Sequence, residues 1–440
     1  MKILVLSEGP PPLGSTIAEG GALRAWGIAK GLIANGQKDV TLAYRSSYDI
    51  AQDANKTKIP ENLTIETWDG DKIDDLLKKH HVVILRYAMG EAWEITRRLT
   101  DKHILVADSY VPISIEVSAR NSSDKNELLN YLSLQDSSAK TMQRADYILY
   151  ASHSQLLYYL GYLSGINKLN PKTYQLLQKR MFQLPYGVDP SDKRVVKTEK
   201  LNDLTLLWYG AFYSWFDMSA LIPSLIRLKN LYPGFKLLIA GAKNPYNNDP
   251  GLLAHYEKTV KELAVLGHAV EYIPWTSFDE RFSIYARGSA ILTFNHLGLE
   301  NEVAWRTRLM DFVLADRPVL TNGGDPLGED LINRGIAFRV AEANLENAIE
   351  AMKKAPPSPD MFKQTAEVYS WKSVTAQLSN SLTSATRLEN GVMKLEDTRV
   401  DLVLKKIVKV IKKPVSAIRY LKQEGVGATL KLTKKRIRGR

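Results

Sequence analysis

The strongest constraint on this fold is a double series of short apolar runs that alternate with longer amphipathic segments. The first series has β-branched apolar runs at residues 2–7, 40–45, 82–87, 104–110 and 147–152. The second series has its runs at residues 204–209, 235–240, 270–274, 290–294, 318–321 and 337–340. Alternation of this kind is typical of parallel strands joined by crossover helices. The pattern therefore predicts an α/β protein with two Rossmann-like, doubly wound domains.

A segment without periodicity separates the two series. Residues 184–190 read Leu-Pro-Tyr-Gly-Val-Asp-Pro and lead into a lysine-rich stretch that ends at Asp203. Turn formers without periodicity are typical of a linker. We therefore expect domains at 1–188 and 189–390, followed by a tail at 391–440. Ligands of open α/β sheets bind beyond the carboxyl ends of the strands, so both domains are expected to face one cleft.

Composition excludes several kinds of site. The chain contains no cysteine, so disulfides, zinc–thiolate sites and cysteine nucleophiles are excluded. The apolar run at the N-terminus ends at Pro10, which is too soon for a secretory signal. No stretch reaches the roughly 18 apolar residues of a membrane span. We expect a cytoplasmic protein that is either soluble or peripheral on the inner face of the cell membrane.

The net charge of +11 is concentrated at the C-terminus. Residues 399–440 contain fourteen Lys or Arg and two acids, so they carry +12 and residues 1–398 carry −1. A neutral body argues against a nucleic-acid partner. Apolar residues between 400 and 411 share one helical face and lysines occupy the other. We expect this basic amphipathic helix to bind an anionic membrane surface; the alternative is a helix docked on the protein body.

A glycine pair opens the first expected helix. Gly20 and Gly21 follow the loop after the first strand, and glycine lets backbone N–H groups approach a ligand closely. A helix N-terminus favours an anion, and Arg24 lies one turn further on. This loop is either an anion site with Arg24 as a fixed charge or a flexible turn with a surface arginine.

A second candidate site lies between residues 295 and 325. His296 follows an apolar strand, and Glu302 opens a helix expected at 302–315, which carries Arg306, Arg308 and Asp311. Arg308 and Asp311 are three residues apart, so they share one helix face. Guanidinium groups and a helix N-terminus suit a diphosphate, and carboxylates accept hydrogen bonds from sugar hydroxyls. The alternative is a surface helix with internal salt bridges.

Several landmarks in order resemble the family 4 glycosyltransferases, especially the branch found in bacterial surface-polysaccharide gene clusters. The resemblance runs from Met1 to about Leu382 and rests on Gly20-Gly21, 106–112, 185–189, 207–217, 241–245, Trp275, 305–311 and Pro318. It implies the GT-B fold, with 1–188 on the acceptor side and 189–390 binding a nucleotide-diphosphate sugar. It also implies transfer with retention of configuration, without a cofactor, to a glycan acceptor. The gene-cluster resemblance and the basic tail suggest that this acceptor is lipid-linked.

The resemblance also assigns roles to individual residues. Asp311 matches the second acid of the family pattern, seven residues before Pro318, which implies that it binds the nucleotide ribose. The first acid position falls on Val303, with Glu302 beside it.

The family's usual Arg and Lys after the first strand of the second domain are missing. Ala211 and Phe216 stand near those places. We expect Arg306, Arg308 or Lys243 to supply the missing charge.

These observations give one set of predicted site residues. We predict catalytic roles for Glu302, Arg308 and His296. We predict donor binding by Gly20, Gly21, Arg24, Trp215, Lys243, Arg306 and Asp311. Trp215 either packs against the donor or wedges its loop, and His296 either touches the donor sugar or is structural.

No metal site is predicted. Asp69-Gly-Asp71 resembles the metal-binding acid pair of the other glycosyltransferase fold, but it precedes a helix expected at 72–79 and is better explained as a cap. Two alternatives to a glycosyltransferase stay open. One is a nucleotide-sugar epimerase of the same fold, and the other is an inactive membrane-bound scaffold of a polysaccharide assembly complex.

Overall fold

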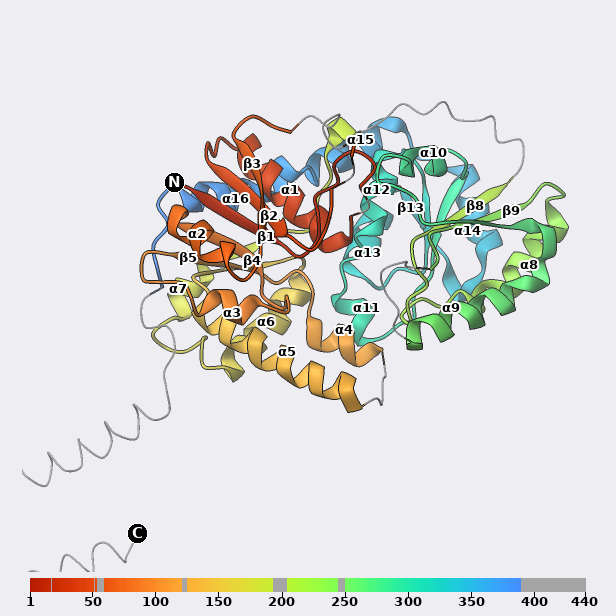
Figure 1. Ribbon diagram of the computed structural model, residues 1–440. Helices are drawn as coiled ribbons and strands as arrows, with labels where there is room; N and C mark the ends of the chain where they lie inside the picture. The colour runs from red at the N-terminus through yellow and green to blue at the C-terminus, as the bar shows by residue number, and fades with distance from the viewer. Residues whose placement is uncertain are drawn as a thin grey trace, which may run out of the picture. The chain divides into compact units, whose positions relative to one another are not determined.

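The computed structural model describes residues 1–16, 18–50, 52–53, 59–120, 125–192, 204–243 and 250–388. The described chain forms two parallel β-sheets with helices packed against them (Figure 1). The prediction of two Rossmann-like domains is confirmed.

The first sheet has seven strands in the order β3-β2-β1-β4-β5-β6-β7. Their bounds are β1 Ile3–Ser7, β2 Val40–Arg45, β3 Leu63–Trp68, β4 Val82–Arg86, β5 Ile104–Asp108, β6 Tyr147–Tyr150 and β7 Met181–Gln183. β1 is buried along its whole length because helices cover both faces of the sheet. The strand order reverses between β1 and β4, so the connections after these strands leave in opposite directions and open a crevice at their carboxyl ends.

Helices cover the two faces of this sheet. One face packs against α1 (Gly20–Ala34) and against α16 (Trp371–Leu382), which comes from the far end of the described chain. The other face packs against α2 Lys72–Lys79, α3 Ala92–Thr96, α5 Lys125–Arg144, α6 His153–Gly165 and α7 Tyr174–Gln178. A short helix, α4 (Ile113–Ala119), contacts both α5 and α11 (Leu299–Val303) of the second half.

The second sheet has six strands in the order β10-β9-β8-β11-β12-β13, with the same reversal between its first strand and its fourth. Their bounds are β8 Thr205–Tyr209, β9 Lys236–Ala240, β10 Val270–Ile273, β11 Ala290–Thr293, β12 Val319–Thr321 and β13 Ala337–Arg339. The remaining α-helices are α8 Ile222–Leu231, α9 Pro250–Leu263, α10 Arg281–Tyr285, α12 Arg308–Leu314, α13 Pro326–Asn333, α14 Leu345–Lys354 and α15 Pro359–Val368. Short 3₁₀ turns are η2 Pro190–Asp192, η3 Ser219–Leu221, η4 Ala264–Ala269 and η5 Ala341–Ala343.

The last described helix returns to the first half of the chain. α16 lies beside α1 (Figure 1), and two glycines of α1 allow the close approach. A Cβ atom on Gly27 would lie 1.9 Å from the indole of Trp371, and one on Gly31 would lie 2.4 Å from the hydroxyl of Thr375. The sequence boundary at 189–390 therefore groups α16 with the second series, although α16 packs on the first.

Two strands and several short helices are not predicted by the sequence pattern. β3 is an edge strand whose side chains alternate in burial, and β7 has three residues. Neither forms the continuous apolar run that marks the other strands. The helices α3, α4, α7 and α11 are each seven residues or shorter, too short to show a helical period.

The expectation of one continuous helix at 302–315 is wrong. α11 ends at Val303, Ala304 has extended backbone angles, and α12 begins at Arg308. The interruption lets Trp305 pack edge-on against Tyr369, with ring centroids 5.8 Å apart. Helical preference is weak beside such tertiary contacts.

The predicted tail at 391–440, including the basic stretch 399–440, lies outside the described residues. Within the part of the chain that the structure describes, no helix combines the length and the apolarity needed to cross a bilayer.

Candidate functional site

Both halves of the body line one cleft of about 480 Å³. Its first wall contains Gly20 and Gly21 at the start of α1, together with residues of α4. Its second wall is built from the loops after β8, β9 and β10 and from the segment joining α11 to α12. Arg308 and Gly21 therefore lie in the same cleft, as the sequence reasoning requires. These positions follow from the parallel sheets, because all carboxyl strand ends of one sheet meet at one edge.

The N-terminus of α1 faces this cleft. Glu19 occupies the N-cap position with extended backbone angles, and the first turn of the helix contains no acidic residue. The first N–H groups of a helix have no partner within the helix, and its dipole is positive at this end. A Cβ at Gly20 or Gly21 would meet no other atom within 4 Å, so the approach to these amides is open. The geometry of this helix end is therefore compatible with the predicted anion site.

Arg24 does not contribute to that site. Its side chain is 1% exposed, and its Nε and Nη2 donate to the two carboxylate oxygens of Asp108 at 2.7 Å each. Nη2 also donates to the carbonyl of Leu184 at 2.9 Å, and the guanidinium lies 4.4 Å from the ring centroid of Tyr110. The structure pairs the charge of Arg24 with Asp108 inside the first domain, which is evidence against the predicted donor binding by this residue. Arg24 joins α1, β5 and the end of β7.

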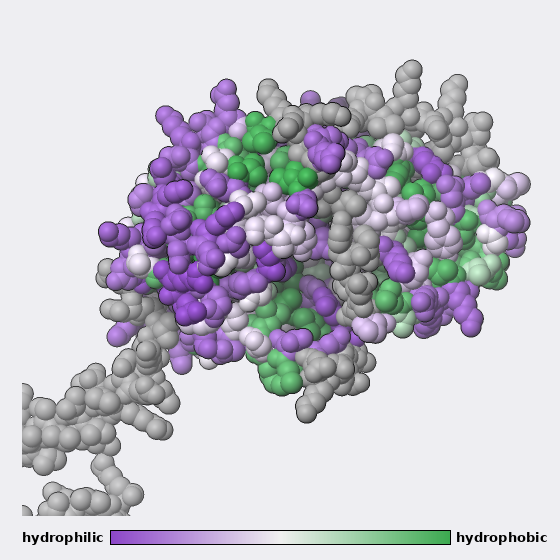
Figure 2. Space-filling view, in the orientation of Figure 1, coloured by the Kyte–Doolittle hydropathy of each residue, from purple (hydrophilic) through white to green (hydrophobic). Residues whose placement is uncertain are grey.

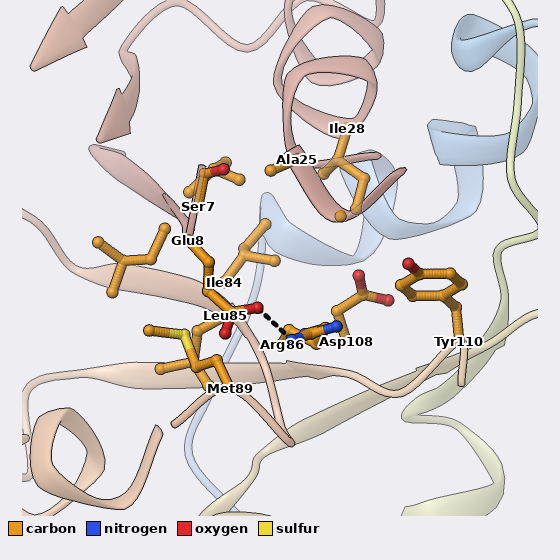
Figure 3. A pocket seen from close by; sticks show the side chains of 13 residues that line it. Ser7, Glu8, Ala25, Ile28, Ile84, Leu85, Arg86, Met89, Asp108 and Tyr110 are labelled. Atoms are coloured by element: carbon orange, nitrogen blue, oxygen red, sulfur yellow. Dashed lines mark ion pairs between the residues drawn. The ribbon is translucent and has the colours of Figure 1, made fainter. Parts of the chain in front are cut away.

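A small recess of about 20 Å³ lies beside the first wall, large enough for about one water molecule. Glu8 and Arg86 form an ion pair across it (Figure 3). Gly21, Arg86 and Tyr110 line both the recess and the cleft. Burial raises the pKa of Tyr110 to about 12, so its hydroxyl remains a hydrogen-bond donor at neutral pH. The first wall is therefore polar and close to neutral in charge.

Arg308 supplies the cation of the second wall. Its Nη2 donates to the carbonyl of Ala211 at 3.2 Å, and its guanidinium lies 4.2 Å from the ring centroid of Phe216. Within the described residues it has no carboxylate partner, and its Nη1 has no hydrogen-bond partner. Burial lowers its pKa to about 10, which leaves it charged at neutral pH. The guanidinium is therefore a buried charge that an anion in the cleft would satisfy.

The close approach of Arg308 depends on a glycine. Gly210, at the carboxyl end of β8, has φ +102°, and a Cβ there would lie 3.2 Å from Cζ of Arg308. Arg308 thus reaches the end of β8. It lies near Ala211 and Phe216, where the family pattern usually has an Arg and a Lys.

Arg306 also lines the cleft, but its charge is compensated. Nη1 and Nη2 donate to the two carboxylate oxygens of Glu300 at 3.0 and 2.6 Å, and Nη2 also donates to the side-chain carbonyl of Asn301 at 2.9 Å. Arg306 and Glu300 together present a neutral, hydrogen-bonding pair. The sequence reasoning did not select Glu300, which the break between α11 and α12 brings back to Arg306.

Asp311 lies in the second wall as predicted. Its Oδ2 accepts from the hydroxyl of Tyr285 at 3.2 Å, and its Oδ1 is 3.5 Å from Nε of Arg281. Both Asp311 and Arg281 line the cleft. Arg281 carries no motif in the sequence, and only its place after the third strand of the second series could have indicated it. Asp311 keeps a carboxylate oriented in the cleft, and its assignment to ribose stays a prediction.

Three predicted residues do not line the cleft. Glu302 is exposed on α11, and Lys243 is exposed just after β9. His296 is about half exposed and lies 3.4 Å from Asp217 through Nδ1. Asp217 also accepts from the backbone N–H of Ala220 at 3.1 Å, as expected for a cap. The structure therefore does not place these three residues in the cleft, and the catalytic roles of Glu302 and His296 and the donor-binding role of Lys243 stay predictions.

Aromatic rings form much of the remaining second wall. Trp215 lines the cleft and stacks on Tyr213, with ring centroids 4.6 Å apart. Trp275 lies over Gly241, where a Cβ would approach its ring to 3.4 Å. Trp275 is a landmark of the family resemblance but was not predicted as a site residue. Flat rings in a cleft offer stacking surfaces for a base or a sugar.

In the acidic pair near residue 70, Asp69 caps the start of α2. Oδ1 of Asp69 accepts from the backbone N–H groups of Asp71 and Lys72 at 3.0 and 2.9 Å. Among the described residues, no group of three or more His, Asp or Glu side chains is placed to hold a metal ion. Metal independence stays a prediction.

The arrangement of the two sheets around this cleft is shared with solved structures. Sucrose-phosphate synthase from Thermosynechococcus elongatus aligns with a TM-score of 0.57 and 14% identity over 87% of this chain and 98% of that protein. Alr3699/HepE from Anabaena, solved with UDP and glucose, aligns with a TM-score of 0.57 and 13% identity over 88% of this chain and 100% of that one.

The lipopolysaccharide outer core galactosyltransferase WaaB, in its apo form, aligns with a TM-score of 0.52 and 12% identity over 87% of this chain and 99% of that one. This chain has the GT-B fold. Neither family models nor curated protein sequences match the chain. At these identities the likeness shows the fold alone. In GT-B terms, the seven-stranded half is the N-terminal domain and the six-stranded half the C-terminal domain.

Proposed function

We propose that this protein is a glycosyltransferase that moves a sugar from a nucleotide-diphosphate donor to a glycan acceptor. One observation carries the proposal: the guanidinium of Arg308, which has no carboxylate partner among the described residues, and the N-terminus of α1 line the same cleft from opposite domains. A buried cation without a carboxylate partner is costly unless a ligand satisfies it. A diphosphate supplies two or more negative charges and oxygen acceptors for both groups.

The other cations of the cleft support this choice of ligand. Arg306 is paired with Glu300, and Arg281 lies near Asp311. Arg308 is therefore the charge that the proposed diphosphate neutralises, and it replaces the Arg and Lys of the family pattern. Asp311 is proposed to accept hydrogen bonds from the ribose hydroxyls. Alr3699/HepE was solved with UDP and glucose, and a further structure of this fold, an alpha-glucosyltransferase, was solved with UDP-glucose and DNA.

The proposed chemistry uses placement and charge stabilisation. As the bond between the anomeric carbon and the diphosphate breaks, negative charge grows on the leaving oxygen, and Arg308 and the α1 amides stabilise it. We propose a family 4 enzyme that retains configuration, in which the departing phosphate accepts the proton of the attacking hydroxyl. Two domains that hold donor and acceptor together supply the orientation. No metal or cofactor is assigned a role.

The acceptor is proposed to be a lipid-linked glycan of surface-polysaccharide synthesis. The N-terminal wall offers the neutral pairs Glu8–Arg86 and Glu116–Arg120, which can exchange hydrogen bonds with sugar hydroxyls. The basic tail is proposed to hold the protein at the inner face of the cell membrane through anionic lipid.

Donor binding is tested with a panel of UDP, GDP and dTDP in thermal-shift and calorimetric titrations. We expect one nucleotide to bind, and Arg308→Met to weaken it by about ten- to a hundredfold, the value of a charged hydrogen bond. Arg308→Lys should recover part of the affinity. Lys243→Met is the matched control, because Lys243 is exposed outside the cleft, and it should bind as the wild type does.

Activity is then measured with the corresponding nucleotide sugars. Slow donor hydrolysis without acceptor supports a transferase and argues against an inactive scaffold. Conversion of the donor into another nucleotide sugar would indicate the epimerase alternative. Equal nucleotide affinity of Arg308→Met and the wild type would contradict the proposed site.

A further inference from the structure

Helix α5 presents three leucines to solvent within its first turns. Leu128, Leu129 and Leu132 are 51, 55 and 61% exposed. Hydrophobic residues gather on this face over α4 and the first half of α5 (Figure 2). Isolated exposed leucines are common on soluble proteins, whereas three within two turns of one helix form an apolar patch of the kind that marks interaction surfaces.

This leucine patch lies on the helix that contacts α4, and α4 lines the cleft. α5 contacts α4, and α4 and its C-terminal end line the N-terminal wall through Ile115, Glu116 and Arg120. α11 also contacts α4, and it carries Leu299, which is 63% exposed. Exposed leucines therefore occur on both helices that contact this wall helix. A ligand that approached the cleft along α4 would pass between them.

The described body also ends at this helix. The backbone N–H of Leu388 donates to Oδ1 of Asp146 at 2.7 Å, two residues beyond the end of α5. The other oxygen of Asp146 accepts from the backbone N–H of Leu105 and from Arg144, so the carboxylate is held on both sides. Leu388, the last described residue, thus lies at the C-terminal end of α5, and the +12 segment 399–440 follows it in the sequence. A helix of this length spans about 30 Å.

We propose that the first half of α5 lies on a lipid bilayer, with Leu128, Leu129 and Leu132 in the boundary between headgroups and acyl chains. Apolar side chains favour that boundary. The segment that follows Leu388 in the sequence carries the positive charge that anionic lipid attracts. The contact turns the α4 side of the cleft toward the membrane. Entry of a lipid-linked acceptor along α4 rests on the proposed function, whereas the bilayer contact does not.

Vesicle flotation of the full chain tests the contact. The vesicles contain equal amounts of phosphatidylcholine and phosphatidylglycerol, and high salt screens the attraction between the basic segment and the lipid. Leu128→Ser/Leu129→Ser/Leu132→Ser should reduce the partition coefficient by at least about tenfold at high salt, because three buried leucines are lost. The control is Leu231→Ser/Val265→Ser, two similarly exposed positions in the C-terminal domain. The control should float as the wild type does.

A triple variant that floats like the wild type at both salt concentrations would overturn the proposal. Unchanged thermal melting of the variants shows that they fold. Sedimentation without vesicles tests whether a second copy of the chain covers the leucine patch instead. If the wild type is a dimer and the triple variant a monomer, the bilayer proposal is also overturned. Loss of nucleotide binding by the wild type would contradict the proposed function and leave the flotation result valid.

A site-specific probe gives a second, independent readout. The chain has no cysteine, so Leu128→Cys and Leu231→Cys each offer a unique position for a polarity-sensitive fluorophore. On addition of the same vesicles, the label at 128 should shift to the blue and the label at 231 should not. Equal responses at the two positions would contradict the proposed orientation.

Discussion

Arg306 turns back along the chain to Glu300, and both of its terminal nitrogens donate to that carboxylate. The two residues are six positions apart in the sequence, and the extended backbone between α11 and α12 makes the contact possible. The acid of α11 that lines the cleft is therefore Glu300, and Glu302 lies outside it.

Exchange of these two acids for their amides should separate their roles. Glu300→Gln weakens the contact that orients the guanidinium of Arg306 in the cleft wall, and misplacement of a cleft residue should lower acceptor-free donor hydrolysis by about tenfold or more. Glu302→Gln should stay within about twofold of the wild type because an exposed acid contributes little. Initial rates at saturating nucleotide sugar check both. A strong effect of Glu302→Gln together with little effect of Glu300→Gln would support the catalytic role predicted for Glu302.

The pair of Arg24 and Asp108 should be a stability determinant. Both side chains are buried, so Asp108→Asn leaves an uncompensated guanidinium and should cost about 3–5 kcal/mol of unfolding free energy. Arg334→Ala, which breaks a more exposed pair with Asp330, should cost less than about 1 kcal/mol. Urea unfolding followed by circular dichroism compares them. Similar losses in the two variants would contradict the structural role of Arg24.

Gly27 should not tolerate a methyl group. Its Cβ would overlap the indole of Trp371, so Gly27→Ala forces α16 away from α1 and should cost at least about 2 kcal/mol. Gly161→Ala is the control, because it is also helical and its Cβ would meet nothing within 4 Å. That control should be neutral or slightly stabilising, since alanine is the better helix former. Thermal melting of both variants decides between these outcomes.

Asp325 should make stability depend on pH. Burial raises its pKa from 3.8 to about 6, although Arg306 and the backbone N–H of Gly328 oppose the rise. The folded state therefore holds this proton more tightly than the unfolded state. The contribution of Asp325 to the unfolding free energy is therefore most favourable below pH 4. It falls as the pH rises to about 6, and the total decrease is at most about 3 kcal/mol.

Asp325→Asn isolates that contribution. Asparagine keeps an oxygen for the bond to Gly328 and has no charge to bury. The unfolding free energy of the variant relative to the wild type should therefore increase between pH 4 and 6 and stay constant from pH 7 to 8. Unfolding measured across this range provides the check. A difference independent of pH would mean that Asp325 titrates normally in the folded protein.

Much of the fold was predictable because buried parallel strands appear in the sequence as continuous apolar runs. The apolar run at Val40–Arg45 and the helix expected at Lys72–Lys79 agree with the structure to the residue. The edge strand Leu63–Trp68 was not predicted, because two of its six side chains are exposed and two more are only partly buried. Local pattern also gives the cap at Asp69, since a cap contacts only the first turn of its own helix.

The site was predictable in part for the same reason. Gly21, Arg308 and Asp311 lie in the first turns of helices, so topology brings each of them to the carboxyl edge of its own sheet, which faces the cleft. The burial of Arg24 depends on Asp108, 84 residues away, and the role of Glu300 depends on a break in helix periodicity. Neither the pairing of Arg24 with Asp108 nor the break between α11 and α12 can be predicted from the local sequence. Lys243 follows its strand as expected, yet its side chain is exposed outside the cleft.

The chain passes between its two domains twice, and the two passages are hydrogen-bonded to each other. The backbone N–H of Val188 donates to the carbonyl of Tyr369, and that of Trp371 donates to the carbonyl of Val188, both at 2.9 Å. A rotation of one domain against the other that keeps these bonds must have its axis near them. Such a pivot lets the cleft widen or narrow as a jaw does, while sliding of one domain past the other would break both bonds. The amides of α1 and the guanidinium of Arg308 would then approach or separate along an arc with one fixed centre.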